Sequence, residues 1–157
     1  MKYTRDSSRQ WYNNLPGKRA SAAMVIRWGD KYLMLKDDYK DYMTFPSGVV
    51  DPDESPLATA IRETNEESGL VFDPQDVSFY SVCYINEYDG FKDRFHFYFL
   101  TEVNDDIDAK IKIGEGIEYY KWVGVDEIAE LAVQQRVYVH LQKLLMSPGS
   151  PEPYFEV

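Results

Sequence analysis

Residues 48–70 read GVVDPDESPLATAIRETNEESGL, an acidic loop that leads into a run of helix-forming residues. Ser55 is a favoured N-cap, because its hydroxyl can accept a hydrogen bond from an unpaired backbone N–H of the first turn. Pro56 suits the first helical position and Gly69 supplies a stop. The stretch therefore predicts a loop followed by a helix from Ser55 to Gly69.

The two faces of this helix differ in chemistry. At about 100° per residue, Glu63, Glu66 and Glu67 place their carboxylates on one face. The opposite face carries a stripe at helical spacing that we expect to pack on a sheet: Leu57, Ile61, Thr64 and Ser68. The carboxylates are thus expected to point outward, away from the sheet.

Carboxylates at this spacing repel one another, each pair costing roughly 0.2–0.5 kcal/mol. A divalent cation reverses that cost, and Mg²⁺ prefers oxygen ligands, keeps several waters and commonly bridges carboxylates to substrate phosphates. The cluster therefore predicts Mg²⁺, with Mn²⁺ as a substitute, and a diphosphate as the bridged ligand. A glutamate-rich helix face alone is most often plain surface, so the case for a metal site depends on the spacing between the helix and the preceding loop.

That spacing follows the pattern G-x5-E-x7-R-E-U-x-E-E-x-G-U, in which U is aliphatic. Its positions are matched by Gly48, Glu54, Arg62, Glu63, Glu66, Glu67, Gly69 and Leu70. The pattern is the Nudix box, and the chain resembles Nudix hydrolases. It departs from the usual family sequence at Thr64 in an aliphatic slot, at Ser47 in place of a glycine, and at Asp53 where glycine is frequent.

The resemblance implies roles for the box residues. Glu63, Glu66 and Glu67, with the backbone carbonyl of Gly48, would bind the metal. Arg62 can pair with Glu66 or reach back to Glu54, and by resemblance Glu54 and Arg62 hold loop and helix together. The implied activity is Mg²⁺-dependent hydrolysis of a phosphoanhydride bond in a nucleoside diphosphate linked to another moiety.

A carboxylate must accept the proton of the attacking water, and family members take it from the helix or from a later loop. Glu63 is the first choice here. Glu118 is the best loop candidate and Glu115 the next, so the identity of the base stays open. Structural roles are favoured for His96 and His140.

Outward from the box, alternating and aromatic runs predict strands at 21–28, 32–35, 42–45, 77–86, 91–101 and 119–123. A terminal helix is predicted from apolar residues at helical spacing: Val137, Leu141, Leu144 and Leu145. Pro148, Pro151 and Pro153 are expected to end regular structure. The fold class is α+β, a Nudix-type α/β/α sandwich with a mixed central sheet between helices. Residues 1–157 are expected to form one domain, with an N-terminal extension at 1–18 and a proline-rich tail at 147–157.

Charge and composition limit the kinds of partner and the cellular location that we expect. The formal net charge of −10 argues against a nonspecific grip on long nucleic acid. Cys83 is the single cysteine, and with two histidines it makes no zinc set, so a reducing cytoplasm is the expected location. No apolar run approaches the ~20 residues that span a bilayer, and the N-terminus lacks a signal-peptide pattern. A homodimer is compatible with the sequence, which leaves the oligomeric state open.

The attached group of the substrate is not encoded in the box. ADP-ribose enzymes of the family tend to carry a proline where Ile85 and its neighbours lie, and dinucleoside polyphosphate enzymes a tyrosine near Tyr88. The aromatic candidates for stacking on a base are Trp11, Tyr12, Tyr39 and Tyr42, although ordinary packing is the favoured interpretation for each. The basic candidates for contact with phosphate are Lys36, Lys40, Lys92 and Arg94, for which solvated surface charge is favoured. The alternative function is a noncatalytic nucleotide-binding module, which usually lacks box carboxylates.

Overall fold

The computed structural model describes residues 4–87, 90–132, 145 and 153–157. In chain order its elements are α1 (Arg5–Asn13), β1 (Arg19–Trp28), β2 (Lys31–Asp37), β3 (Met43–Thr44), β4 (Ser47–Val49), α2 (Pro56–Ser68), η1 (Pro74–Asp76), β5 (Ser78–Ile85), β6 (Arg94–Glu102), η2 (Asp108–Lys110), β7 (Ile117–Gly124), α3 (Val125–Ala132) and β8 (Tyr154–Glu156). The predicted strands and the central helix are confirmed, with small shifts at their ends.

The strands form a mixed sheet with β1 at its centre. The order is β3-β2-β1-β6-β5-β8, while β4 pairs with β1 and β7 pairs with β2. β1 runs parallel to β6 from Arg19 to Arg27, and antiparallel to both β2 and β4. β2 and β4 pair with opposite ends of β1, and the connection between them includes the edge strand β3, which pairs with β2.

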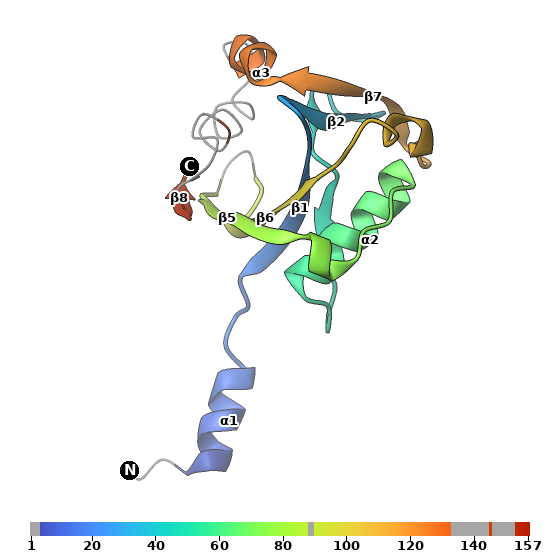
Figure 1. The fold of residues 1–157 in the computed structure, drawn as a ribbon. Coiled ribbons are helices and arrows are strands. Elements are labelled where there is room, and N and C mark those ends of the chain that lie inside the picture. The colour runs from blue at the N-terminus through green and yellow to red at the C-terminus, as the bar shows by residue number, and fades with distance from the viewer. Residues whose placement is uncertain (1–3, 88–89, 133–144, 146–152) are drawn as a thin grey trace.

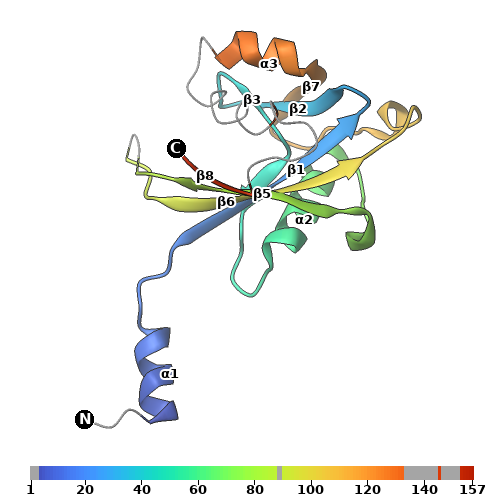
Figure 2. The ribbon, with the colours of Figure 1, turned by 60° about the vertical axis from the view of Figure 1, so that its left-hand side comes forward.

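Helices cover both faces of this sheet, as the α+β prediction requires. Successive residues of β1 point to opposite faces. Ala22 and Met24 pack in a core cluster that includes Ala60 of α2, whereas Ala23 belongs to a second cluster that includes Ile128 of α3. Figure 2 views part of the sheet nearly edge-on, with α3 above it and α2 below.

The helix α2 forms for the local reasons read from its sequence. Ser55 Oγ accepts from the Ala58 N–H at 3.2 Å, Pro56 opens the helix, and Gly69 ends it in the left-handed region at φ 72°. Thr64 and Ser68 are buried as predicted, and Leu57 and Ile61 pack against the core cluster that contains Ala22 and Met24 of β1. Thr59 and Ala60, outside the predicted stripe, are also buried.

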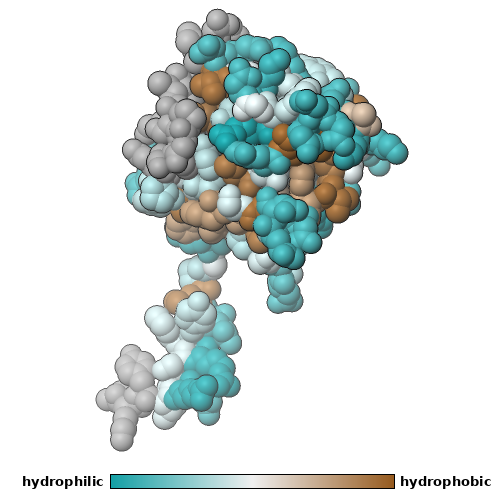
Figure 3. All heavy atoms as spheres, viewed as in Figure 1, coloured by the Kyte–Doolittle hydropathy of each residue, from teal (hydrophilic) through white to brown (hydrophobic). Residues whose placement is uncertain are grey.

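The two ends of the chain hold structure that the sequence did not suggest. Within 1–18, a capping box between Thr4 and Ser7 starts α1, which has no buried residues and stands clear of the body in Figures 1 and 3. The prediction that the prolines end regular structure is wrong, because β8 follows Pro153 and pairs parallel with β5. Pro153 supplies only its carbonyl, which accepts from Val82 N–H, so its missing donor costs nothing there.

Some predictions fall on residues that the structure does not describe. Val137, Leu141 and Leu144 of the predicted terminal helix belong to this group, as do His140 and Tyr88. Leu145 is described, helical and buried. Within the described ranges, no helix is both long and apolar enough to span a bilayer.

Candidate active site

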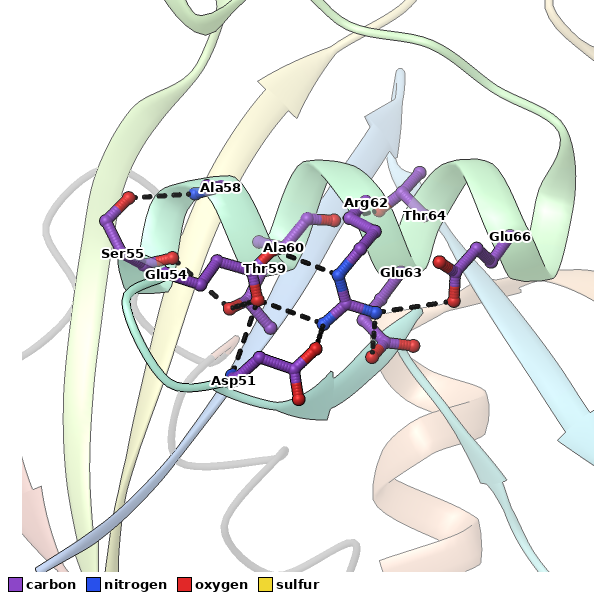
Figure 4. Close-up of polar contacts among 10 residues, drawn as sticks. All are labelled: Asp51, Glu54, Ser55, Ala58, Thr59, Ala60, Arg62, Glu63, Thr64 and Glu66. Atoms are coloured by element: carbon purple, nitrogen blue, oxygen red, sulfur yellow. Dashed lines mark hydrogen bonds and ion pairs between the residues drawn. The ribbon is translucent and has the colours of Figure 1, made fainter.

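A bidentate pair joins the loop before α2 to the helix itself (Figure 4). Arg62 Nε donates to Glu54 Oε1 at 2.9 Å, and Arg62 Nη2 donates to Glu54 Oε2 at 3.0 Å. The Thr59 hydroxyl also donates to Glu54 Oε2, at 2.6 Å. Hydrogen bonds from Arg62 and then Thr59 lower the pKa of Glu54 to about 2. The loop is therefore fixed against the first two turns of the helix by an ionised carboxylate.

The remaining guanidinium nitrogen of Arg62 serves the acidic face. Nη1 donates to Glu63 Oε1 at 2.8 Å and to Glu66 Oε2 at 3.3 Å. Both partners considered for Arg62, Glu54 and Glu66, are thus contacted at once. Hydrogen bonds to Glu54 and then to Glu63 raise the pKa of Arg62, which stays charged. Its charge offsets the repulsion that the clustered carboxylates would otherwise feel.

Glu63 lies directly against the backbone of β4. A Cβ atom on Gly48 would overlap the Glu63 carboxylate, so position 48 must be glycine for Glu63 to approach. Gly48 pairs with Ala22 at the centre of the sheet, and the Glu63 side chain is 16% exposed. The sequence placed Gly48 and Glu63 in one site, and the structure brings them into contact.

Glu67 is turned toward the same strand. Its Oε2 accepts from the Ser47 backbone N–H at 3.0 Å. Burial, opposed by that hydrogen bond but assisted by the charges of Asp37 and Glu63, raises the pKa of Glu67 to about 7. The expectation that all the box carboxylates point outward is wrong for Glu63 and Glu67, because both side chains lie against the backbone of β4. Glu66, with 57% of its side chain exposed, does point outward.

Asp37 and Lys40 belong to this neighbourhood and were not predicted as a pair. Asp37 ends β2 with only 6% of its side chain exposed, and its carboxylate forms an ion pair with Lys40 Nζ. The charge of Asp37 acts to raise the pKa of Glu67 and that of Lys40 to lower it, so both charges act on this box carboxylate. The available signal was an acidic residue ending the otherwise apolar run YLMLKD.

The two later candidates for the base lie on β7 and in the loop just before it. Glu118 lies on β7 with 49% of its side chain exposed, and its carboxylate accepts from Lys36 Nζ at 3.2 Å. In the described part of the chain, this ion pair joins Glu118 to β2 and not to the helix of the box. Glu115 is exposed in the preceding loop. That loop is tied to the end of α2, since Gly114 N–H donates to the Glu67 carbonyl at 3.0 Å.

The other side chains considered from sequence lie elsewhere. Trp11 and Tyr12 are exposed on α1, away from the box, whereas Tyr39 is exposed beside Lys40. His96 Nδ1 lies 2.5 Å from Ser21 Oγ, between β6 and β1. Lys92 pairs with Glu87 in the β5–β6 connection.

The donor chemistry at the box fits a hard divalent cation. All side-chain donors there are carboxylate oxygens, the ligands that hard divalent cations prefer. The pKa of Glu67 is raised first by burial and then by the charges of Asp37 and Glu63, so a bound cation would favour its ionised form. Across the described ranges, no three His, Cys, Asp or Glu side chains already converge in metal-binding geometry. An open arrangement of this kind suits Mg²⁺, which keeps waters and takes ligands from substrate phosphates.

Comparisons with known proteins agree on one family. A family model described as NUDIX domain matches residues 17–143. The chain is 33% identical over 114 residues to the bis(5′-nucleosyl)-tetraphosphatase [asymmetrical] of Rattus norvegicus, covering 72% of this chain and 77% of that protein. It is 25% identical over 141 residues to the RNA pyrophosphohydrolase of Pelagibacter ubique, covering 81% and 89%. The structure of a C. elegans Ap4A hydrolase binary complex superposes with a TM-score of 0.65 at 24% identity, over 82% of this chain and 93% of that one.

Proposed function

This chain belongs to the NUDIX family of phosphoanhydride hydrolases, and from that premise we propose that it is a Mg²⁺-dependent nucleotide pyrophosphohydrolase. The proposed substrate is a nucleoside diphosphate linked to another moiety, with a dinucleoside polyphosphate as the first candidate. The relative with 33% identity carries the name of an asymmetrical bis(5′-nucleosyl)-tetraphosphatase, which supports that choice.

The observation that carries the proposal is the approach of Glu63 and Glu67 to one short strand. Glu63 lies against Gly48, and Glu67 accepts from the neighbouring Ser47 N–H. We assign Glu63, Glu66, Glu67 and the Gly48 carbonyl to holding the metal. Nudix hydrolases generally use divalent ions, and bound Mg²⁺ supplies charge neutralisation of the diphosphate and a lower pKa for a bound water.

The chain's own residues do the rest of the proposed work. Arg62 and Glu54 keep loop and helix in register, so that the carboxylates stay at fixed positions relative to Gly48. Glu63 is proposed as the acceptor of the water proton, because its carboxylate lies against Gly48, whose carbonyl is assigned to the metal. Glu118 and Glu115 are the alternatives for that role.

The test is a substrate panel with Mg²⁺ or Mn²⁺. Bis(5′-nucleosyl) tetraphosphates, nucleoside triphosphates, a 5′-triphosphorylated RNA oligonucleotide and ADP-ribose are incubated with the protein, and products are separated by chromatography. We expect metal-dependent cleavage of a tetraphosphate into two unequal nucleotides. Turnover should fall by roughly 10²–10⁴ in Glu63→Gln and Glu67→Gln. Glu87→Gln, an exposed glutamate far along the chain, is the matched control and should keep wild-type turnover.

The same panel separates the alternatives. Retained nucleotide binding without turnover of any substrate would identify a noncatalytic binding module instead. For the base, Glu63→Gln and Glu118→Gln are compared at saturating metal. We expect the larger loss of kcat in Glu63→Gln, and the reverse order would transfer the role to Glu118.

A further inference from the structure

The loop between β2 and β3 carries a lysine beside the box that the proposed chemistry has not used. Lys40 Nζ forms an ion pair with Asp37, and the two side chains are 21% and 6% exposed. The ring of exposed Tyr39 lies 5.1 Å from the same ammonium. Lys40 is therefore held in place by a buried carboxylate, while its own side chain remains partly exposed.

Several connections place this loop at the box. The chain runs from Lys40 through β3 to Ser47 and Gly48, the two residues that meet Glu67 and Glu63. Asp37 follows Leu33 and Leu35 on β2, both of which belong to the cluster under α2. At the start of the loop, Asp38 N–H donates to the Gly116 carbonyl at 2.9 Å, which joins it to the loop that carries Glu115.

The other nearby cations each bind two or more oxygen-bearing groups, whereas the carboxylate partner of Lys40 in the described residues is Asp37. Arg62 is bound to Glu54, Glu63 and Glu66. Lys36 donates to Glu118 and to the Asp37 carbonyl. A diphosphate brings more negative charge to a site rich in carboxylates, so it needs a cationic donor besides the metal, and lysine serves phosphates as a point charge.

We propose that Lys40 binds the phosphate oxygens of the substrate and that Asp37 is a positioning residue that orients its ammonium. This inference rests on the proposed hydrolase function and extends it to the recognition of the phosphate chain. It reverses the sequence-based preference for solvated surface charge at Lys40. For Lys92, whose ion pair with Glu87 joins two exposed side chains, that preference is kept.

A purely structural role for Lys40, as the counter-ion of Asp37, makes different predictions. Loss of a counter-ion lowers stability and affects every substrate equally. Loss of a phosphate ligand raises KM for the substrate but leaves cation binding intact. Removing positive charge near Glu67 should even strengthen the binding of a divalent cation, so metal and substrate affinities should move in opposite directions.

The experiment compares Lys40→Met with Lys40→Arg and with the matched control Lys92→Met. Steady-state kinetics are measured on the best substrate of the panel, and Mn²⁺ affinity is measured by electron paramagnetic resonance of the free ion. In Lys40→Met, kcat/KM should fall about 10- to 100-fold, the size of a lost charge-assisted hydrogen bond, mainly through KM. Mn²⁺ affinity should be unchanged or higher, and Lys40→Arg should recover part of the loss. A kcat/KM within twofold of Lys92→Met would overturn the proposal.

Asp37 is tested separately because it is buried. Asp37→Asn should raise KM by a smaller factor than Lys40→Met, and the double variant should be no worse than Lys40→Met alone. Additive losses in the double variant would overturn the positioning role. Thermal melting of each variant confirms that folded protein is compared.

A second measurement keeps this inference distinct from the hydrolase proposal. If the wild-type protein cleaves no substrate, the proposed function fails, but Lys40 can still be tested with methylenediphosphonate, which cannot be hydrolysed. Its binding to Mn²⁺-loaded protein is measured by calorimetry. Weaker binding to Lys40→Met than to Lys92→Met supports the phosphate contact, and equal binding overturns it.

Discussion

Arg62 donates to both carboxylate oxygens of Glu54, at 2.9 and 3.0 Å, and so locks the loop of the box onto its helix. The pair spans eight residues of sequence, and its geometry needs the planar fork of arginine. Because Nη1 of the same guanidinium also reaches Glu63 and Glu66, one side chain orders both the loop and the acidic face.

Arg62→Lys should therefore weaken the site more than a charge-conserving change normally does. A lysine cannot make the bidentate contact, so the carboxylates lose a fixed frame. We expect kcat/KM to fall roughly 10- to 100-fold and unfolding free energy to fall by about 1 kcal/mol. Urea denaturation and steady-state kinetics measure the two effects. Arg9→Lys on exposed α1 is the control, and equal behaviour of the two variants would contradict the clamp.

Glu67 links stability to pH. Its pKa is about 7 in the folded protein, above the ordinary value of 4.5, so the folded state holds the proton more tightly between these values. Stability from this group is fully present below the lower value and is lost as pH rises through the higher one. Without metal, Glu67→Gln should exceed wild type in unfolding free energy at about pH 8 by roughly 1–3 kcal/mol.

The same pair of proteins should converge at about pH 3, below both pKa values, where wild-type Glu67 is protonated in the folded and the unfolded state. Adding Mg²⁺ at the higher pH should stabilise wild type and leave Glu67→Gln nearly unchanged. Chemical denaturation across pH, with and without Mg²⁺, measures all of these differences. A pH-independent gap between the two proteins would rule out titration of Glu67 as the cause.

Two glycines near the box should respond differently to substitution by alanine. At Gly48 the new methyl group meets the end of the Glu63 side chain, which can swing away. Gly48→Ala should then cost under about 1 kcal/mol of stability but roughly 100-fold in turnover. At Gly114 it meets the backbone carbonyl of Glu66, so Gly114→Ala should lose about 1–3 kcal/mol. Thermal melting measures the loss of stability and steady-state kinetics measure the loss of turnover. Equal melting temperatures of Gly48→Ala and Gly114→Ala would contradict the prediction.

Asp53 occupies the left-handed region at φ 65°, an uncommon conformation for a residue with a side chain. This explains why glycine is frequent at the corresponding position of the Nudix box. Asp53→Gly should raise unfolding free energy by about 1 kcal/mol with turnover unchanged. Asp53→Ala, which has a Cβ but no side-chain oxygen to bond locally, should be destabilised, and its denaturation midpoint should lie below that of wild type.

The sequence by itself determined the helix α2 and the identity of most box residues. Ser55, Pro56 and Gly69 act on their own neighbours, and a spacing along a helix fixes which side chains share a face. Local rules also located the strands, since alternation and turn residues act over a few positions. The resemblance of the box to a known pattern supplied the chemistry that these rules cannot.

Only the tertiary structure decided which partners those elements met. The parallel pairing of β1 with β6 and of β5 with β8 joins segments distant in sequence, and nothing local encodes it. The antiparallel pairing of β4 with β1 brought β4 against Glu63 and Glu67, two carboxylates expected to point outward. The fold also brought the charges of Asp37 and Lys40 to bear on Glu67. A side chain's burial and the charges around it depend on what folds over it, and so pKa values and substrate contacts follow from the assembled sheet rather than from spacing along the chain.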